Sequence, residues 1–287
     1  MTNQLWYVFG SSVRGASHIR TKLPNQDAID WLAWYGRDQQ FVTVAIADGH
    51  GNARYFRSAI GAQKAVEVAK TLLKELGRAY SNSRNLTPLK EMAEQHLPQI
   101  LVRQWDDAIA THLANAPFTE AELSKQSADF RAKLAVNPRL AYGSTVAATL
   151  LTQTFALYVQ LGDGDILTVD PGGRATRAPL VIDPHLSGDA TTSLCLPQAW
   201  RYVRTYLLPL ADYLPAMIML ATDGYSNSFA TEAGFLKAGQ DIFQIVQAQA
   251  QQGVQVLRNE LGQWLSQTSE RGSGDDISVG IIYRPVR

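Results

Sequence analysis

Four short runs of apolar and β-branched residues, each bordered by aspartate, constrain the fold of this 287-residue chain more than any other feature. Such runs predict buried β-strands, and they occupy residues 41–47, 155–161, 217–221 and 277–283. The first three lead into Asp48, Asp163 and Asp223, whereas Asp275 and Asp276 precede the fourth. One Asp-Gly after a strand usually reflects only turn chemistry. Four acidic strand ends in one sheet system instead predict that carboxylates converge.

The order of the helical and strand signals indicates the fold class. Apolar residues at a period of about 3.6 predict a helix over residues 60–76 that ends at Gly77, and a second helical stretch that Pro98 kinks or divides. A capping box at Thr119 predicts a third helix, and one or two more are expected over residues 242–264. Because helices and strands come in blocks rather than in regular alternation, the sequence favours an α+β fold with a largely antiparallel sheet.

Length and composition suggest the domain organisation. The chain is long enough for one large domain with a substantial core, although length alone would also permit two smaller ones. We expect a single domain over residues 1–287. Proline and glycine recur at about 170–215 and apolar periodicity is patchy there, which predicts a flap-like peripheral excursion with a short helix around residues 197–204.

Charge and cysteine content exclude several classes of protein. The 26 basic and 26 acidic residues give a formal net charge of zero, whereas nucleic-acid-binding proteins usually have a basic excess or a basic face. The single cysteine, Cys195, excludes an intrachain disulfide. The sequence shows neither a secretory signal pattern nor an apolar window long enough to cross a bilayer. We therefore expect a soluble cytoplasmic protein that binds neither nucleic acid nor membranes.

The acidic strand ends suggest a chemistry. If Asp48, Asp223 and one of Asp275 and Asp276 met without a counter-charge, they would repel one another and raise each other's pKa. Oxygen ligands without cysteine or paired histidine suit Mg²⁺ or Mn²⁺. Two such ions can activate a water and bind phosphoryl oxygens, so hydrolysis of a phosphate ester is the natural reaction. His50 follows Asp48 by two residues, and a histidine with an ordinary pKa of about 6.5 could protonate the leaving group at neutral pH.

Six short motifs, in order along nearly the whole chain, resemble those of the metal-dependent Ser/Thr protein phosphatases of type 2C. They are LPNQDA from residue 23, IADGHG from 46, GSTVAATLL from 143, LGDGDI from 161, LATDGYSNSF from 220 and GSGDDISVGII from 272. Each motif is weak alone, but six in the same order form a strong signal. The resemblance implies an αββα sandwich, in which helix pairs flank two antiparallel sheets.

The resemblance also implies a role for each site residue. It implies two Mn²⁺ or Mg²⁺ ions, with Asp48 bridging both and Asp27 acting through bound water. His50 would be the general acid. The family's metal-binding Asp precedes the final strand at the spacing of Asp275, which selects Asp275 over Asp276. The implied metal site comprises Asp48, the Gly49 carbonyl, Asp223, Asp275 and Asp27.

The chain departs from the family at the phosphate-binding position. Lys22 stands where relatives commonly have an arginine that binds the substrate phosphate, and lysine cannot pair with phosphate bidentately. Arg20 and His18 are further candidates for this task, although a solvated basic face explains them equally well. Gly164 and Asp165 replace the Ser and Arg of a Gly-Asp-Ser-Arg element, so its usual pairing must differ.

The resemblance predicts an enzyme that removes phosphate from phosphoserine or phosphothreonine in proteins and opposes a Ser/Thr kinase. Leu140 and Asn227 replace aspartates that bind a third metal in some relatives, so we expect a two-metal centre. One alternative is a regulatory or binding module with this fold and weak or no catalysis, which the changes at Lys22, Gly164 and Asp165 would suit. Another is a phosphatase that acts on small molecules with the same metals.

Overall fold

The strands form two five-stranded antiparallel sheets in the computed structural model, which describes residues 6–36, 39–183, 191–210, 214–248 and 251–285. The strand order of the first sheet is β1 (Tyr7–Val13), β10 (Ile277–Tyr283), β9 (Met217–Ala221), β6 (Asp165–Val169) and β7 (Ala175–Arg177). The order of the second is β2 (Ala28–Tyr35), β3 (Gln40–Ala47), β4 (Val146–Thr152), β5 (Phe155–Leu161) and β8 (Arg204–Pro209).

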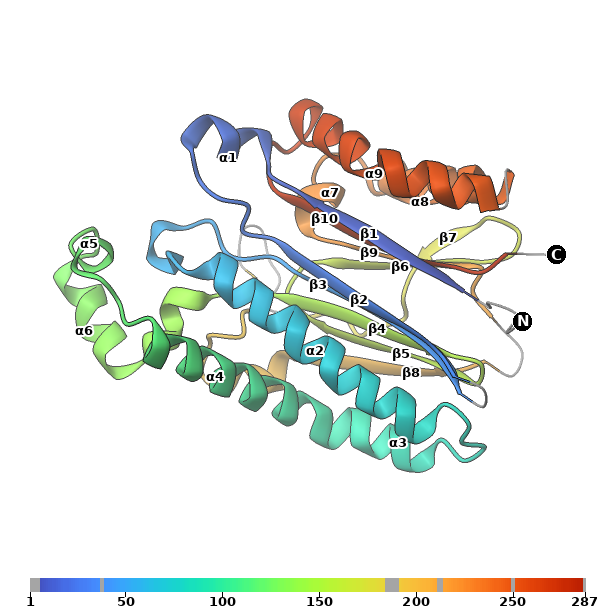
Figure 1. Ribbon diagram of the computed structural model, residues 1–287, viewed down its shortest axis with the longest axis horizontal. Helices are drawn as coiled ribbons and strands as arrows, with labels where there is room; N and C mark the ends of the chain where they lie inside the picture. Colours follow the sequence, from blue (N-terminus) through green and yellow to red (C-terminus); the bar gives the residue numbers. More distant parts are fainter. Residues whose placement is uncertain (1–5, 37–38, 184–190, 211–213, 249–250, 286–287) are drawn as a thin grey trace.

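Long helices cover the outer side of each sheet (Figure 1). The pair α2 (Ser58–Tyr80) and α4 (Leu97–Asn115) lies over the second sheet, and the pair α8 (Glu232–Ala248) and α9 (Gln251–Arg271) lies over the first. The shorter helices are α1 (Ala16–Thr21), α3 (Thr87–Glu91), α5 (Glu120–Leu123), α6 (Ala128–Val136) and α7 (Asp223–Ser226). This arrangement confirms the αββα sandwich. None of the described helices combines the length and the apolar character needed to span a bilayer.

The central strands read as continuous apolar runs because both of their faces are buried. In β3, Val44 and Ile46 face the other sheet and pack in one cluster with Leu220 of β9. The alternate residues Phe41 and Ala45 pack in the cluster beneath α2. Side chains alternate between the two faces of a strand, so a strand between two apolar layers needs apolar residues at every position.

Gly77 has a different role from the helix cap that the sequence suggested. Helix α2 continues through this residue to Tyr80, so the predicted helix end is wrong. A Cβ at position 77 would lie 2.6 Å from Cδ2 of Phe41. The glycine therefore lets α2 approach β3 closely, a packing role that local sequence patterns do not reveal.

The other local predictions for the helices are confirmed. A π-helical turn, Met92–His96, separates α3 from α4, and Pro98 is the second residue of α4. Thr119 and Glu122 form a capping box at the start of α5. Two helices, α8 and α9, occupy the region in which one or two were expected.

Residues 170–215 contribute to both sheets, which the sequence did not predict. Residues 184–190 and 211–213 of this segment lie outside the described part of the chain. The remainder includes the edge strands β7 and β8. A 3₁₀ turn, Ala199–Tyr202, accounts for the predicted short helix.

Three strands have an aspartate-bordered end on the side of the molecule where α1 and α7 lie (Figure 1). β3 leads directly into Asp48, and β9 leads through Thr222 into Asp223 at the start of α7. β10 begins immediately after Asp275 and Asp276. The antiparallel topology thus brings the end of two strands and the beginning of a third to the same edge of the molecule.

Candidate active site

A cavity of about 980 Å³ lies where these strand ends meet. Its wall includes most of the predicted site residues, namely His18, Asp48, Gly49, His50, Asp223 and Asp275. It also includes residues that were not predicted as site residues, among them Arg54, Tyr55, Asp163, Asp165 and Arg177. A concave site with converging titratable groups is typical of an active site.

Hydrogen bonds from neighbouring loops fix the turn after β3. The Asp48 amide donates to Oγ1 of Thr145 (3.0 Å), and the Gly49 amide donates to the carbonyl oxygen of Gln26 (3.1 Å). A Cβ on Gly49 would lie 2.6 Å from that carbonyl oxygen. Glycine is thus required here by close backbone packing, which holds the Asp48 carboxylate and the Gly49 carbonyl in place.

Asp223 begins α7, and an asparagine one turn later orients its carboxylate. Nδ2 of Asn227 donates to Oδ2 of Asp223 at 3.0 Å, and the Asn227 amide donates to the Asp223 carbonyl at 2.8 Å. Asn227 therefore supports the existing carboxylate and adds no further negative charge to the cavity.

Asp27 lies behind the cavity wall rather than in it. The residue is buried, and its Oδ2 accepts a hydrogen bond from Oγ1 of Thr222 at 2.7 Å. Thr222 Oγ1 in turn accepts from the Ser278 amide at 2.8 Å, which ties Asp27 to both β9 and β10. This position suits a carboxylate that acts through water, as the resemblance implies.

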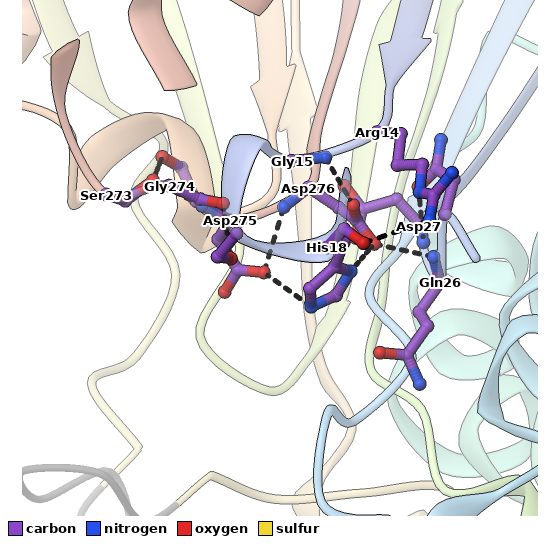
Figure 2. Close-up of polar contacts among 12 residues, drawn as sticks. Arg14, Gly15, His18, Gln26, Asp27, Ser273, Gly274, Asp275 and Asp276 are labelled. Atoms are coloured by element: carbon purple, nitrogen blue, oxygen red, sulfur yellow. Dashed lines mark hydrogen bonds and ion pairs between the residues drawn. The ribbon is translucent and has the colours of Figure 1, made fainter. Parts of the chain in front are cut away.

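Asp275 and Asp276 point in different directions (Figure 2). Asp276 is buried, and its two oxygens accept hydrogen bonds from the Gly15 amide (2.6 Å), the Gln26 amide (2.6 Å) and Nδ1 of His18 (2.8 Å). The Asp275 side chain is 51% exposed and lines the cavity. Asp276 is thus an internal anchor, and Asp275 is the member of the pair that faces the cavity.

His18 lies between these two carboxylates. Its Nε2 is 3.6 Å from Oδ1 of Asp275, while Nδ1 contacts Asp276 (Figure 2). One ligand atom from each of the three residues lies within 4.8 Å of the others. Asp276 accepts hydrogen bonds from three N–H donors and does not line the cavity. His18 and Asp275 are the two members of this group that line it.

The carboxylates around the cavity raise one another's pKa. Burial and then the charges of Asp27 and Asp223 raise the pKa of Asp48 well above its ordinary value. Burial also raises the pKa of Asp27, against the hydrogen bond from Thr222, and the charges of Asp276 and Asp223 add to the rise. Divalent cations compensate such charge, and the all-oxygen donor set fits Mg²⁺ or Mn²⁺. The residues present therefore fit a metal centre.

Asp163 belongs to the same electrostatic group. Burial and then the charge of Asp223 raise the pKa of Asp163 to about 6, and the residue lines the cavity. The sequence marked Asp163 as an acidic strand end but assigned it no role in the site. The missing information was spatial, because its proximity to Asp223 depends on how the strands are arranged.

His50 is less basic than the sequence suggested. Its ring packs against Tyr55 with the centroids 4.8 Å apart. Burial, followed by the positive charge of Arg54, lowers the pKa of His50 to about 4, so the expectation of an ordinary pKa was wrong. A proton-donating His50 therefore needs a nearby anion, such as a bound phosphate group, to raise its pKa again.

The basic residues that line the cavity are mostly not those that the sequence analysis proposed for phosphate binding. Arg20 and Lys22 are exposed and do not line the cavity, whereas His18 does. Arg54 and Arg177 line it instead. Both arginines lie outside recognisable motifs, so no sequence signal identified them.

The altered Gly-Asp-Ser-Arg element has a new ion-pair partner. Asp165, which replaces the arginine of that element, is buried and forms an ion pair with Arg177 of β7. Nε of Arg177 also lies 2.7 Å from Oε1 of Glu232 at the start of α8. In this chain the acidic residue, Asp165, therefore occupies the motif position of the arginine, and its arginine partner comes from the neighbouring edge strand β7.

The sequence matches the family model described as "Protein phosphatase 2C" over residues 14–266. No curated protein matches it. Among solved structures, a C. elegans sex determining protein is similar with a TM-score of 0.56 and 17% identity, over 98% of this chain and 66% of that one. The catalytic domain of the serine threonine protein phosphatase PstP, in complex with two manganese ions, is also similar, with a TM-score of 0.51 and 17% identity. The match covers 98% of this chain and 99% of that domain. At these identities the likeness to solved structures concerns the fold alone.

Proposed function

The chain belongs to the protein phosphatase 2C family, and on that premise we propose that it hydrolyses phosphoserine and phosphothreonine in proteins with Mn²⁺ or Mg²⁺. The observation that carries the proposal is the meeting of Asp48, Asp223 and Asp275 in one cavity. These carboxylates come from three separate strand ends and repel one another. Such an arrangement costs stability unless cations bind, which favours an enzyme over a binding module that needs no metal.

Two ions held by Asp48, the Gly49 carbonyl, Asp223 and Asp275 would supply an activated water and neutralise phosphoryl charge. The chain itself orients these ligands. The hydrogen bond from the Asp48 amide to Oγ1 of Thr145 holds the Asp48 backbone, and the Asn227 amide group holds the Asp223 carboxylate. The manganese ions of the PstP structure support Mn²⁺ as the first ion to test.

Of the three basic residues nominated for phosphate binding, His18 is the one with direct access to the cavity. Its Nδ1 contacts Asp276, so Nε2 is the nitrogen available near Asp275. Arg20 and Lys22 are exposed outside the cavity wall, where they could contact a phosphoprotein substrate away from the reacting group. The substrate would be the product of a Ser/Thr kinase.

The proposed function predicts Mn²⁺-dependent release of phosphate from a phosphothreonine peptide. Activity should disappear when EDTA removes the metal and return when Mn²⁺ is added in excess, because the proposed reaction depends on a water that the ions would activate. Circular dichroism should show that the metal-free protein stays folded. A folded protein that releases no phosphate from the peptide or from p-nitrophenyl phosphate at any Mn²⁺ concentration would instead support the binding-module alternative.

Replacing His50 by alanine should affect substrates unequally. We expect kcat to fall about a hundredfold for a phosphothreonine peptide and less than about fivefold for p-nitrophenyl phosphate, because an aryl leaving group scarcely needs a proton donor. His96, which is exposed in the π-helical turn, provides the control variant His96→Ala, with unchanged kcat on both substrates. Equal losses on the two substrates would assign His50 a structural role, such as packing against Tyr55.

A further inference from the structure

Arg54 is held at the cavity wall by its own short helix and by an aromatic stack. It lies in the 3₁₀ helix Ala53–Tyr55, and the side chain of Asn52 accepts a hydrogen bond from its amide at 3.1 Å. The guanidinium carbon lies 4.7 Å from the centroid of the Tyr55 ring. Tyr55 in turn packs against His50, at 4.8 Å between ring centroids. This stack places the charge of Arg54 beside His50, two residues from Asp48.

The charge of Arg54 is available to a ligand. Arg177, the other arginine of the cavity wall, is neutralised by ion pairs with Asp165 and Glu232. Among the described residues, Arg54 forms no ion pair with a carboxylate, although the same cavity is lined by Asp48, Asp163, Asp165, Asp223 and Asp275. The guanidinium stacks on Tyr55, and because no carboxylate of the described chain pairs with it, N–H donors remain for an anion that is not part of the chain.

We propose that Arg54 binds the phosphoryl group of the substrate. This inference rests on the proposed phosphatase function and assigns to Arg54 the task that the sequence left among Lys22, Arg20 and His18. Arginine presents a planar fork of N–H donors that matches two phosphoryl oxygens, which lysine cannot do. A phosphate bound by Arg54 would also lie close to His50, because both side chains contact the ring of Tyr55. Arg54 therefore orients the phosphoryl group next to the residue proposed to protonate the leaving group.

Binding of inorganic phosphate to the Mg²⁺-loaded protein, measured by calorimetry, tests the inference without turnover. Arg54→Ala should weaken phosphate binding about tenfold, and Arg54→Lys should recover part of the loss because it restores the charge but not the fork. KM should rise by a similar factor for the phosphothreonine peptide and for p-nitrophenyl phosphate, since both carry the phosphoryl group. Arg78→Ala is the matched control, because Arg78 stacks on Trp34 at 4.6 Å outside the cavity, and phosphate binding should not change.

The outcomes separate this inference from the proposed function. Unchanged phosphate affinity in Arg54→Ala overturns the role of Arg54, even if the parent protein hydrolyses phosphopeptides. A rise in KM confined to the peptide also overturns it, because Arg54 would then contact the peptide rather than the phosphoryl group. Conversely, weaker phosphate binding by Arg54→Ala in a protein without phosphatase activity would support the anion site and refute only the proposed function.

Discussion

Asp48→Asn is expected to lower kcat for Mn²⁺-dependent hydrolysis of a phosphothreonine peptide at least about a thousandfold. The amide removes one negative charge and one oxygen ligand at the proposed bridging position. The fold should remain, because the hydrogen bonds that hold this turn involve the Asp48 backbone and Thr145. Steady-state kinetics at saturating Mn²⁺ and calorimetric Mn²⁺ binding measure the two consequences.

The same substitution should stabilise the metal-free protein. Asp48 is surrounded by Asp27, Asp223 and Asp275, whose charges oppose its ionised form. Removing one charge from this group should raise the melting temperature in EDTA by a few degrees, and the stabilisation by Mn²⁺ should shrink. A residue that lowers metal-free stability and is essential for activity is dedicated to function rather than to folding.

Asp170→Asn is a suitable control for Asp48→Asn. Asp170 also follows a strand, β6, but its Oδ1 accepts a hydrogen bond from the Arg174 amide at 2.9 Å in a turn outside the cavity. Its replacement should leave kcat within about twofold of the parent value. Full activity in Asp48→Asn would refute the proposed mechanism.

The sequence predicted the acidic strand ends well because each is a local pattern. An apolar run followed by aspartate is readable at Asp48 or Asp223 without knowledge of any partner. The recurrence of this pattern already predicted that the ends converge, whereas the two-sheet sandwich that brings them together was predicted only from the order of six motifs and their resemblance to a family. The edge strands β7 and β8 were missed because they are short or only partly buried and have little apolar periodicity.

The sequence could not identify groups whose role depends on distant neighbours. In the sequence, Arg54 and Arg177 are isolated arginines that belong to no motif. Only the fold places them at the same cavity. Gly77 resembled a helix cap until its contact with Phe41 showed a packing constraint. The pKa of His50 likewise follows from burial and from Arg54, neither of which the motif around Asp48 contains.

Asp276→Asn is expected to lower the free energy of unfolding of the metal-free protein by about 3 kcal/mol. Asp276 is 3% exposed and accepts hydrogen bonds from two backbone amides and from Nδ1 of His18. An asparagine has one acceptor oxygen and turns its NH₂ group toward these donors, so at least one buried donor loses its partner. The lost bonds connect β10 to the segment between β1 and β2, which contains Gly15, His18 and Gln26. Urea denaturation measures the change.

Asp275→Asn makes the same chemical change at the adjacent residue and should give the opposite pattern. The Asp275 side chain is 51% exposed, so the free energy of unfolding should change by less than about 0.5 kcal/mol. Mn²⁺ affinity and kcat should fall, because Asp275 faces the cavity beside Asp223. If Asp275→Asn instead destabilised the protein and left Mn²⁺ binding intact, the proposed roles, with Asp276 stabilising the fold and Asp275 binding the metal, would be wrong. Neighbouring side chains diverge in an extended backbone, which is why one Asp-Asp pair can place one carboxylate in the interior and the other in the cavity proposed to bind cations.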